Sequence, residues 1–353
     1  MDCKPCFKRY QIDAPMRISL KDIAEKLKLS KTTVSWVLSG QADKKGISKA
    51  TQELVKKCAE EMDYQPNLIA RSLNIGRTKT IGLILPSISD DFYSSVAREI
   101  EKNASEHDYA LMIASSEANI EKEDNILRMF RSKGVDGIIL APTKGSKIEI
   151  ERMIGNQFPL VTFDRFFSEL DVNYVIIDNK ASSYKLTKHL ISRGCRNIAL
   201  ITTNPHLTTM GNRCDGYMQA LEEAGIKFNL SLIANVAYKN YEKNIVKALD
   251  SIFEAVPEVD GFFFTTHILA LEAFLYFSNR GLNFNEDFKL ASIHSVSTFK
   301  ILAPKVNIAE MPVADIGKTA VEILLKDIEY KGPNSGKKEH LKVVLPCILH
   351  LND

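Results

Sequence analysis

Short apolar runs alternate with amphipathic helices from Thr80 to the C-terminus, and this alternation restricts the fold more than any other feature. Helical patterns such as Phe92–His107 and Lys180–Arg193 separate the runs. The eight clearest runs are four to six residues long: Thr80–Leu85, Ala110–Ala114, Gly137–Leu140, Leu160–Phe163, Tyr174–Ile177, Asn197–Ile201, Gly261–Phe264 and Lys289–Ile293. Strands that alternate with helices form parallel sheets covered on both faces. We therefore expect two doubly wound α/β lobes, with ligands bound outside the carboxyl ends of the strands.

The residues before Thr80 follow a different pattern, that of three short amphipathic helices. Ser19–Lys28 is followed almost at once by Ser30–Leu38, and Ser48–Met62 comes after a polar loop. Each segment begins with a serine that can cap a helix. Three short helices with a tight turn between the first two predict an all-α helix-turn-helix head.

Charge differs between the two parts of the chain. Residues 17–80 contain 13 Lys and Arg against 7 Asp and Glu, whereas residues 81–353 contain 30 against 35. A basic head on an acidic body indicates a polyanionic partner for the head alone.

Several classes of protein are disfavoured by composition. The chain contains no run of about 18 apolar residues, and its first 16 residues lack the apolar core of a signal peptide. The six cysteines are scattered, which suits a reducing compartment. Cys3 and Cys6 form a C-x-x-C in a polar leader, which we interpret as an extension and not as a metal or redox site. We expect a cytoplasmic protein with no membrane partner, no metal and no cofactor.

The combined segments resemble the LacI/GalR family of bacterial repressors from Met16 onward. The matching stretches are SLKDIAEKLKLSKTTVSWVLSG, Ile47-Ser48 with MDYQPNLIARSL, GRTKTIGLILPSISDDFY, GVDGIIL, Phe163-Asp164-Arg165, Ile177-Asp178-Asn179, and Pro312 followed by Ile316-Gly317. This resemblance implies a homodimer whose body has the periplasmic-binding-protein fold. It also implies that an effector between the lobes alters the affinity of the head for a palindromic operator.

The same resemblance suggests domain boundaries. We expect an extension over residues 1–16, a helix-turn-helix domain over 17–64, a hinge helix and linker over 65–79, and an effector-binding and dimerisation domain over 80–353. One lobe of that last domain is expected to contain 80–179 and 308–333, and the other 180–307 and 334–353. Whether Met1 or Met16 is the true start stays open.

The second helix of a helix-turn-helix lies in the major groove and presents its first residues to the base edges. We expect Lys31 and Thr32 to contact bases, and Ser30 and Thr33 to hold phosphates. Trp36 stands where the family usually has an arginine, so the base read at this position is open. Packing of Trp36 against the core of the head is the alternative.

The linker resembles the hinge helix of the family, in which a leucine wedges into the minor groove. That residue maps to Leu73, and Arg71 and Asn67 beside it are placed to hold the DNA backbone. Exposure of Leu73 on an ordinary linker is the alternative. A hinge that folds only on DNA would let small shifts of the lobes decide whether it forms.

Four body residues map to positions that contact the effector in the family. Phe92 and Tyr93 follow the first strand, where an aromatic ring stacks on the ligand; ordinary core packing is the alternative. Arg213 maps to the arginine that grips the effector in the family, and its fork suits carboxylates or neighbouring hydroxyls; a purely structural ion pair is the alternative. Asp164 maps to a hydroxyl acceptor, with a hinge role as the alternative.

The remaining pocket candidates include two departures from the family. Thr209 and Tyr238 align with the pocket wall. His267 and His294 replace residues that are commonly acidic, and imidazoles in place of carboxylates make an anionic ligand such as a sugar acid or sugar phosphate more tolerable. A pair of surface histidines is the alternative reading.

Two rival classes find little support. There is no G-x-G-x-x-G, P-loop, G-x-S-x-G or H-E-x-x-H motif, so we expect no catalytic residues and no enzyme. A transport binding protein would share the fold of the body, but it would carry a signal peptide and lack the basic head. The sequence therefore predicts a DNA-binding transcriptional regulator, most simply a repressor, controlled by a small molecule.

Overall fold

The structure is a computed structural model that describes residues 18–64, 76–203, 208–237, 240–330 and 339–352. The chain divides into two compact units, Met1–Gly76 and Arg77–Asp353, which are described separately. No described helix is long and apolar enough to cross a membrane.

The first unit contains the three expected helices α1 (Leu20–Leu27), α2 (Lys31–Leu38) and α3 (Lys49–Glu61), with a 3₁₀ turn η1 (Asp43–Lys45) before α3. The Ser30 side chain caps α2 by accepting a hydrogen bond from the Thr33 amide at 2.9 Å. Lys28 ends α1 in the left-handed conformation, with φ 55°. The buried core of this unit is small: Ile23, Ala24, Val34, Val37, Ala42, Val55, Cys58 and Ala59. The predicted helix-turn-helix arrangement is confirmed.

The second unit contains two six-stranded sheets in its described residues. Sheet A runs in the order β11-β5-β4-β3-β1-β2, with β1 (Thr80–Leu85), β2 (Ala110–Ser115), β3 (Gly137–Leu140), β4 (Leu160–Phe163), β5 (Asn173–Ile177) and β11 (Lys342–Leu345). Sheet B runs β12-β10-β9-β8-β6-β7, with β6 (Ile198–Thr203), β7 (Ile233–Val236), β8 (Gly261–Phe264), β9 (Lys289–Ile293), β10 (Asn307–Glu310) and β12 (Ile348–His350). Neighbouring strands are parallel except β10 and β12, which are antiparallel. The predicted pair of doubly wound lobes is confirmed.

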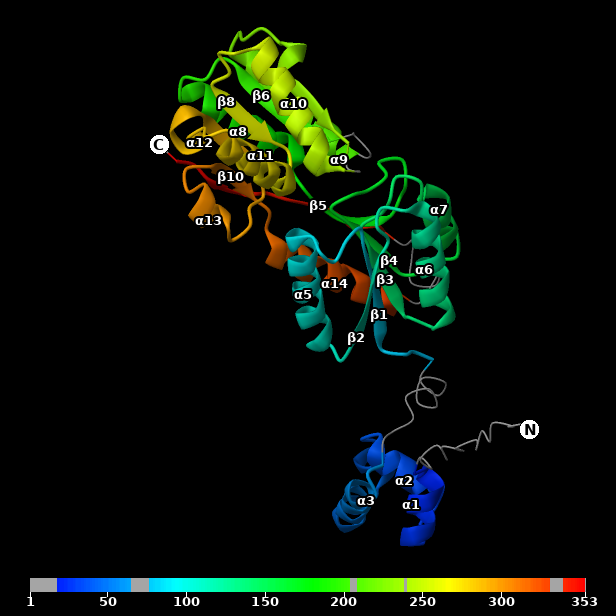
Figure 1. The fold of residues 1–353 in the computed structure, drawn as a ribbon. Helices are drawn as coiled ribbons and strands as arrows, with labels where there is room; N and C mark the ends of the chain where they lie inside the picture. The colour runs from blue at the N-terminus through cyan, green and yellow to red at the C-terminus, as the bar shows by residue number, and fades with distance from the viewer. Residues whose placement is uncertain (1–17, 65–75, 204–207, 238–239, 331–338, 353) are drawn as a thin grey trace, which may run out of the picture. The chain divides into compact units, whose positions relative to one another are not determined.

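Helices cover both faces of sheet A (Figure 1). The helices α5 (Asp91–Ser105) and α14 (Val313–Glu329) lie on one face, and α6 (Ile120–Ser132) and α7 (Lys147–Gly155) lie on the other. The side chains of strand β1 pack on both faces of the sheet. Ile81 and Leu83 belong to the core cluster with α5 and α14, whereas Ile84 belongs to the cluster with α6 and α7. Alternate strand residues point to opposite faces.

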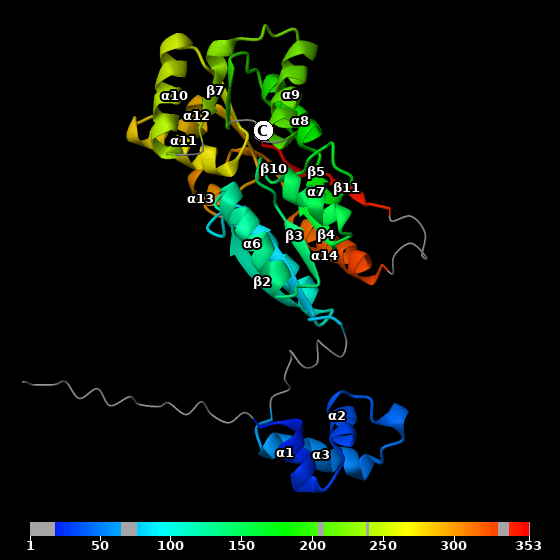
Figure 2. The same cartoon turned by 90° about the vertical axis from the view of Figure 1, so that its right-hand side faces the viewer.

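Sheet B is covered in the same way (Figure 2). Its helices are α8 (Asn179–Ser192) and α9 (Thr208–Glu223) on one face, and α10 (Tyr241–Ala255) and α11 (His267–Asn279) on the other, with the short elements η2 (Leu230–Leu232), α12 (Phe284–Asp287) and α13 (Phe299–Leu302) at its edges. Gly216 permits the close approach of α8 and α9, since a Cβ atom there would lie 2.2 Å from the Lys180 carbonyl oxygen.

Within the described residues, the chain passes between the two lobes three times: after β5, between β10 and α14, and between β11 and β12. The expected division of the C-terminal segment differs from this arrangement. Strand β10 lies in sheet B because Asn307–Glu310 pairs with β9 before the chain returns to sheet A. Strand β11 lies in sheet A because Lys342–Leu345 pairs with β5. Three crossing segments hold the carboxyl ends of the two sheets close to each other.

Candidate functional site

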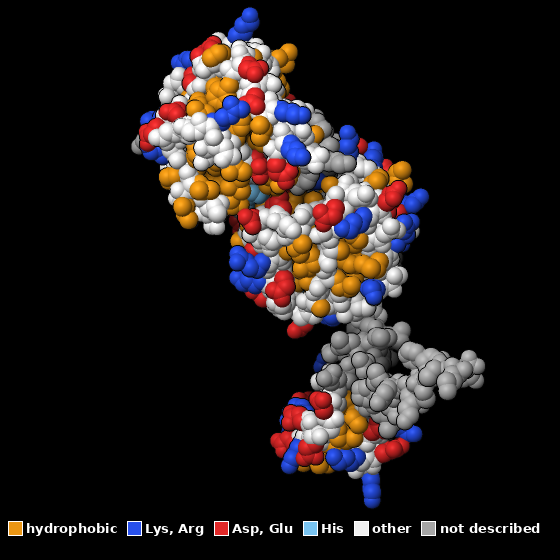
Figure 3. Space-filling model, viewed as in Figure 1, with side chains coloured by type: hydrophobic (Ala, Val, Ile, Leu, Met, Phe, Trp, Pro, Cys, Tyr) orange, Lys and Arg blue, Asp and Glu red, His pale blue; other side chains and the backbone are white. Residues whose placement is uncertain are grey.

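A cavity of about 100 Å³ lies where the two lobes meet. Segments that follow β1, β4, β6, β7, β8 and β9 line it, as expected for a ligand site outside the carboxyl ends of parallel strands. The space-filling view shows a recess between the lobes in which acidic side chains and a histidine are visible (Figure 3). The lining residues are Asp90, Phe92, Tyr93, Asp164, Arg165, Thr203, Thr209, Met210, Arg213, Val236, Tyr241, Thr266, His267, Ile268, Leu269, Ile293, His294 and Met311.

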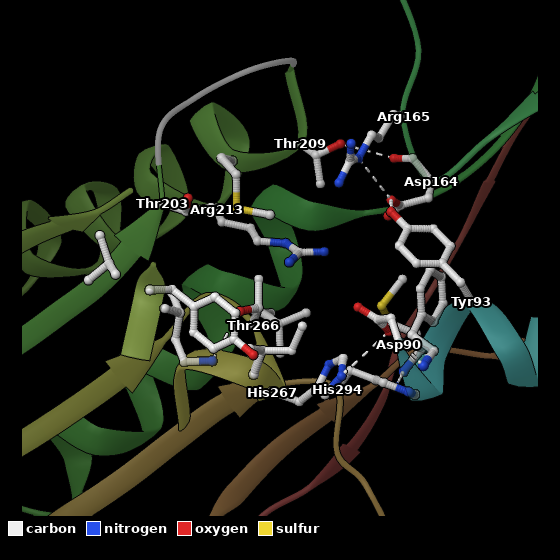
Figure 4. A pocket seen from close by; sticks show the side chains of 18 residues that line it. Asp90, Tyr93, Asp164, Arg165, Thr203, Thr209, Arg213, Thr266, His267 and His294 are labelled. Atoms are coloured by element: carbon white, nitrogen blue, oxygen red, sulfur yellow. Dashed lines mark hydrogen bonds and ion pairs between the residues drawn. The ribbon is translucent and has the colours of Figure 1, made fainter. Parts of the chain in front are cut away.

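Arg213 projects from α9 into this cavity with only 3% of its surface exposed (Figure 4). Its Nε donates to Asn179 Oδ1 at 2.7 Å, and its Nη1 donates to the carbonyl oxygen of Thr265. These two bonds hold the guanidinium plane against the second lobe. Burial lowers the pKa of Arg213 from its usual value, and the attraction of Asp164 partly opposes that effect.

Asp164 faces Arg213 from the first lobe (Figure 4). It directly follows β4 with φ 59°, a left-handed conformation that aspartate tolerates better than most residues. Its Oδ2 accepts a hydrogen bond from the Tyr93 hydroxyl at 2.7 Å and lies 3.6 Å from Arg165 Nε. Its carbonyl oxygen accepts from Thr209 Oγ1 at 2.9 Å, which joins the two lobes. Burial holds the pKa of Tyr93 well above its usual value, so Tyr93 remains a donor.

His294 occupies the corresponding place in the second lobe, directly after β9 and also left-handed, with φ 64°. Its Nδ1 accepts a hydrogen bond from the Met311 amide at 3.4 Å. Its ring contacts that of Phe92 edge to face, with centroids 5.4 Å apart. Burial, with the nearby His267 and Arg213, lowers the pKa of His294 to about 3, so the imidazole is neutral at pH 7.

A second contact between the lobes joins His267 and Asp90. His267 Nε2, at the start of α11, lies 3.6 Å from Asp90 Oδ1, which also caps α5 by accepting from the Phe92 amide at 2.9 Å. Burial raises the pKa of Asp90 and lowers that of His267, and their mutual attraction opposes both shifts. The rings of His267 and His294 lie 5.4 Å apart.

The structure brings seven of the predicted effector residues together at the cavity: Phe92, Tyr93, Asp164, Thr209, Arg213, His267 and His294. Tyr238 lies outside the described residues. Phe92 and Tyr93 are 5% exposed and belong to the core cluster, so they serve as core and as cavity wall. Both histidines are buried, which excludes the alternative of a surface pair.

Sequence reasoning missed Asp90, Arg165, Thr203, Tyr241 and Thr266 at the cavity. Asp90 and Thr266 precede helices, so a search for capping residues beside Phe92 and His267 would have found them. Thr203 ends β6, and its buried hydroxyl has no hydrogen-bond partner in the described structure. Among the described residues, no group of three or more His, Cys, Asp or Glu side chains is arranged to hold a metal ion.

In the first unit, the start of α2 carries the predicted DNA-contact residues. Lys31 and Thr32 are exposed, as base readers must be. Ser30 and Thr33 share a hydrogen bond between their hydroxyls at 2.8 Å, so both hydroxyls take part in the helix cap. Trp36 is half-buried, and the Lys45 ammonium group lies 5.1 Å from the centroid of its ring. Asn67, Arg71 and Leu73 lie outside the described residues.

Comparison with known families matches both units. Residues 19–67 match the bacterial regulatory proteins of the lacI family. Residues 78–348 match the periplasmic binding proteins and sugar binding domain of the LacI family. The chain belongs to the LacI family. It is therefore a DNA-binding transcriptional regulator with a body built to bind a small-molecule effector.

Similar proteins agree with this assignment. The ribose operon repressor of Halalkalibacterium halodurans is 31% identical over 89% of this chain and 91% of its own length. The HTH-type transcriptional regulator RegA of Clostridium saccharobutylicum is 31% identical over 90% of this chain and 94% of its own. A solved structure of the lac repressor dimer bound to operator and an anti-inducer shares the fold, with a TM-score of 0.78 and 19% identity over 94% of this chain and 97% of its own.

Proposed function

We propose that this LacI-family protein is a cytoplasmic repressor that binds a palindromic operator as a homodimer. Binding of a small sugar-type effector determines whether the protein releases or retains the operator. One observation supports the proposal most strongly. The chain that carries a lacI-type head also holds, between two lobes, a buried cavity lined by two arginines, two carboxylates and several hydroxyls. Such mixed polar and aromatic walls suit a polyhydroxylated ligand.

The head reads DNA through the start of α2. Lys31 donates to guanine acceptors, and Thr32 contacts a neighbouring base edge or a thymine methyl. Ser30 and Thr33 hold phosphates. Their hydroxyls bond each other in the helix cap, and the hydroxyl proton that this bond does not use donates to a phosphate. Trp36 contributes one indole donor and apolar surface at the base edge.

The hinge couples the head to the body. Leu73 enters the minor groove as a wedge, and Asn67 and Arg71 hold the backbone beside it. We propose the division into an extension (1–16), the head (17–64), the hinge and linker (65–79) and the effector-binding and dimerisation body (80–353).

The effector acts through contacts that join the lobes. Asp164 and Arg213 come from different lobes, and a ligand held by both favours the lobe arrangement in which both reach it. The Thr209 bond to Asp164 and the His267 contact with Asp90 connect the same two lobes. Phe92 and Tyr93 supply the aromatic wall. Tyr238 is proposed as a further effector contact because it aligns with a pocket-wall position of the family. A ligand shifts the DNA-competent population only by its differential affinity for the two lobe arrangements.

We further propose that the protein has no catalytic activity, because the described residues of the cavity include no nucleophile paired with a base. Asp164 accepts from Tyr93, and His294 is held by the Met311 amide, so both groups serve recognition.

The proposal is tested with the full chain. An operator is first selected from random-sequence duplexes, and sugars, sugar acids, sugar phosphates and nucleobases are screened by thermal shift. Compounds that bind are then added to operator titrations at one stated salt concentration. We expect at least one sugar-type compound to change operator affinity, and Lys31→Ala to weaken operator binding more than binding to random duplex. Binding of all duplexes with equal affinity, or a best ligand outside the sugar classes, would contradict the proposal.

A further inference from the structure

The second lobe presents a buried guanidinium, that of Arg213, which is attracted by Asp164 but forms no ion pair within 4.0 Å among the described residues. The guanidinium of Arg213 is 3% exposed, and both of its assigned bonds go to neutral oxygens, those of Asn179 and Thr265. No carboxylate among the described residues lies within 4.0 Å of it, whereas Arg165 has Asp164 at 3.6 Å. Burial of a charge without a contacting ion is costly, so a ligand anion that touches the guanidinium would be favoured there.

His294 adds a donor of fixed orientation to the same wall. Because its Nδ1 accepts from the Met311 amide, the proton of the neutral ring lies on Nε2. No hydrogen-bond partner of this Nε2 is found among the described residues, and the side chain lines the cavity. The edge-to-face contacts with Phe92 and His267 keep the ring in place. This N–H therefore suits an acceptor atom and disfavours a ligand group that only donates.

Two further groups on the second lobe can donate to a ligand acceptor. Thr203 Oγ1 is buried, lines the cavity and has no partner in the described residues. The first turn of α11, which follows the cap residue Thr266, also borders the cavity. The amides at the start of a helix carry partial positive charge and stabilise a nearby anion.

The carboxylates of the cavity already have partners on the first lobe. Asp164 Oδ2 receives the Tyr93 hydroxyl, and Asp90 Oδ1 receives the Phe92 amide and faces His267. Each keeps a second oxygen that can accept from a ligand hydroxyl. The first-lobe side of the cavity thus offers carboxylate acceptors, with Arg165 paired to Asp164, whereas the second-lobe side offers Arg213 and the His294 N–H, neither of which contacts a carboxylate of the described residues (Figure 4).

We propose that the effector is a sugar acid of monosaccharide size, with its carboxylate bound by Arg213 and His294 and its hydroxyls directed to Asp164. This inference rests on the proposed function and specifies the ligand of the same cavity. A cavity of about 100 Å³ is small beside the roughly 300–1,000 Å³ of common ligand sites, which favours one sugar ring or chain over a disaccharide. A planar carboxylate also matches the two-pronged geometry of a guanidinium better than a single hydroxyl does.

The test compares acids with neutral sugars of equal size on the full chain. The affinities for D-ribonate, D-ribose, D-gluconate, D-glucose and D-ribose 5-phosphate are measured by calorimetry at pH 7 and one salt concentration. We expect an acid to bind about 10- to 100-fold more tightly than its neutral partner, the range that one charge-assisted contact supplies. A neutral sugar that binds equally or more tightly overturns the inference, and tighter binding of the phosphate overturns the carboxylate assignment.

Variants of His294 test the geometry itself. His294→Asp places an acceptor carboxylate where a donor stood, at a backbone position with φ 64° that aspartate tolerates. It should remove the preference for the acid and retain the neutral sugar. His294→Asn, whose amide still donates, should keep part of the preference. His107→Asp, at an exposed histidine outside the cavity, controls for the change of charge. Equal loss of acid and neutral sugar in His294→Asp would refute the assigned contact.

The outcome separates this inference from the proposed function. If neutral sugars bind best and change operator affinity, the regulator assignment stands and the sugar-acid inference fails. If neither class binds the parent chain, both the inference and the sugar-type effector are wrong.

Discussion

Replacement of Arg213 by alanine should abolish the response to the effector at a measurable cost in stability. The change removes the bonds to Asn179 Oδ1 and to the Thr265 carbonyl, which lie in the buried wall of the second lobe. Hydrogen bonds to charged groups contribute about 1.5–3 kcal/mol each, and loss of the desolvation cost of the buried guanidinium offsets part of that sum. We expect the free energy of unfolding to fall by about 2–4 kcal/mol.

The effect on regulation should be larger than the effect on basal DNA binding. Coupling between two sites is commonly about 1–3 kcal/mol, which corresponds to about a 5- to 150-fold change in operator affinity when the effector binds. Without the Arg213 fork, a ligand loses its main contact with the second lobe, and the ratio of affinities should approach one. Operator affinity without the effector should stay close to that of the parent, because Lys31, Thr32 and Leu73 are unchanged.

The assay is an operator titration by fluorescence anisotropy with and without the identified effector, at one salt concentration. Urea unfolding of each variant shows how much folded protein is present. Arg98→Ala, at an exposed arginine of α5, is the matched control and should keep the parent ratio. Arg213→Lys keeps the charge but lacks the fork, so it should respond weakly. A folded Arg213→Ala variant with the parent ratio would refute the assignment of Arg213 as effector anchor.

Three more predictions concern the hinge, the symmetry and the pH dependence. Leu73→Ala should weaken binding to the operator far more than binding to random duplex at the same salt concentration, because a wedge supports only the kinked complex. Equal losses of affinity for the two DNAs would show that Leu73 is no wedge. Footprinting should reveal two related half-sites about 34–36 Å apart, and full affinity for a single half-site would exclude the symmetric dimer. Between pH 7 and 5 the parent should lose about 2 kcal/mol of stability through His294, because the unfolded residue titrates near 6.5 and the folded residue near 3. His294→Asn should lack that loss, and an equal pH dependence in urea unfolding would contradict a neutral buried His294.

Local patterns predicted the three helices of the head, the helices α5 and α8 of the body, and eight of the twelve described strands. Ser30 and Ser48 mark the true starts of α2 and α3, because capping is an interaction between near neighbours. Strands such as β3 and β4 are buried on both faces and so read as continuous apolar runs. Strand β11 was missed because it lies at an edge of sheet A, where only alternate residues are covered.

The site was less accessible to sequence reasoning. The resemblance supplied Arg213 and Asp164, but their partners Asn179 and Tyr93 are 34 and 71 positions away, and no local pattern records such contacts. The left-handed backbone of Asp164 and His294, which follows from the way each strand ends at the cavity, was equally invisible. The burial of His294 showed that this residue lines the cavity and does not lie on the surface. Burial depends on the packing of both lobes, which no local pattern records.

In the proposed mechanism, a ligand in the cavity between the lobes controls the affinity of the head for its operator. The most direct measurement is the operator affinity of the full chain, titrated at one salt concentration with and without a compound that binds the body. We predict a change of about 5- to 150-fold on the operator. If the compound binds with high affinity and the operator affinity stays the same, the cavity does not regulate the head and the proposed mechanism is wrong.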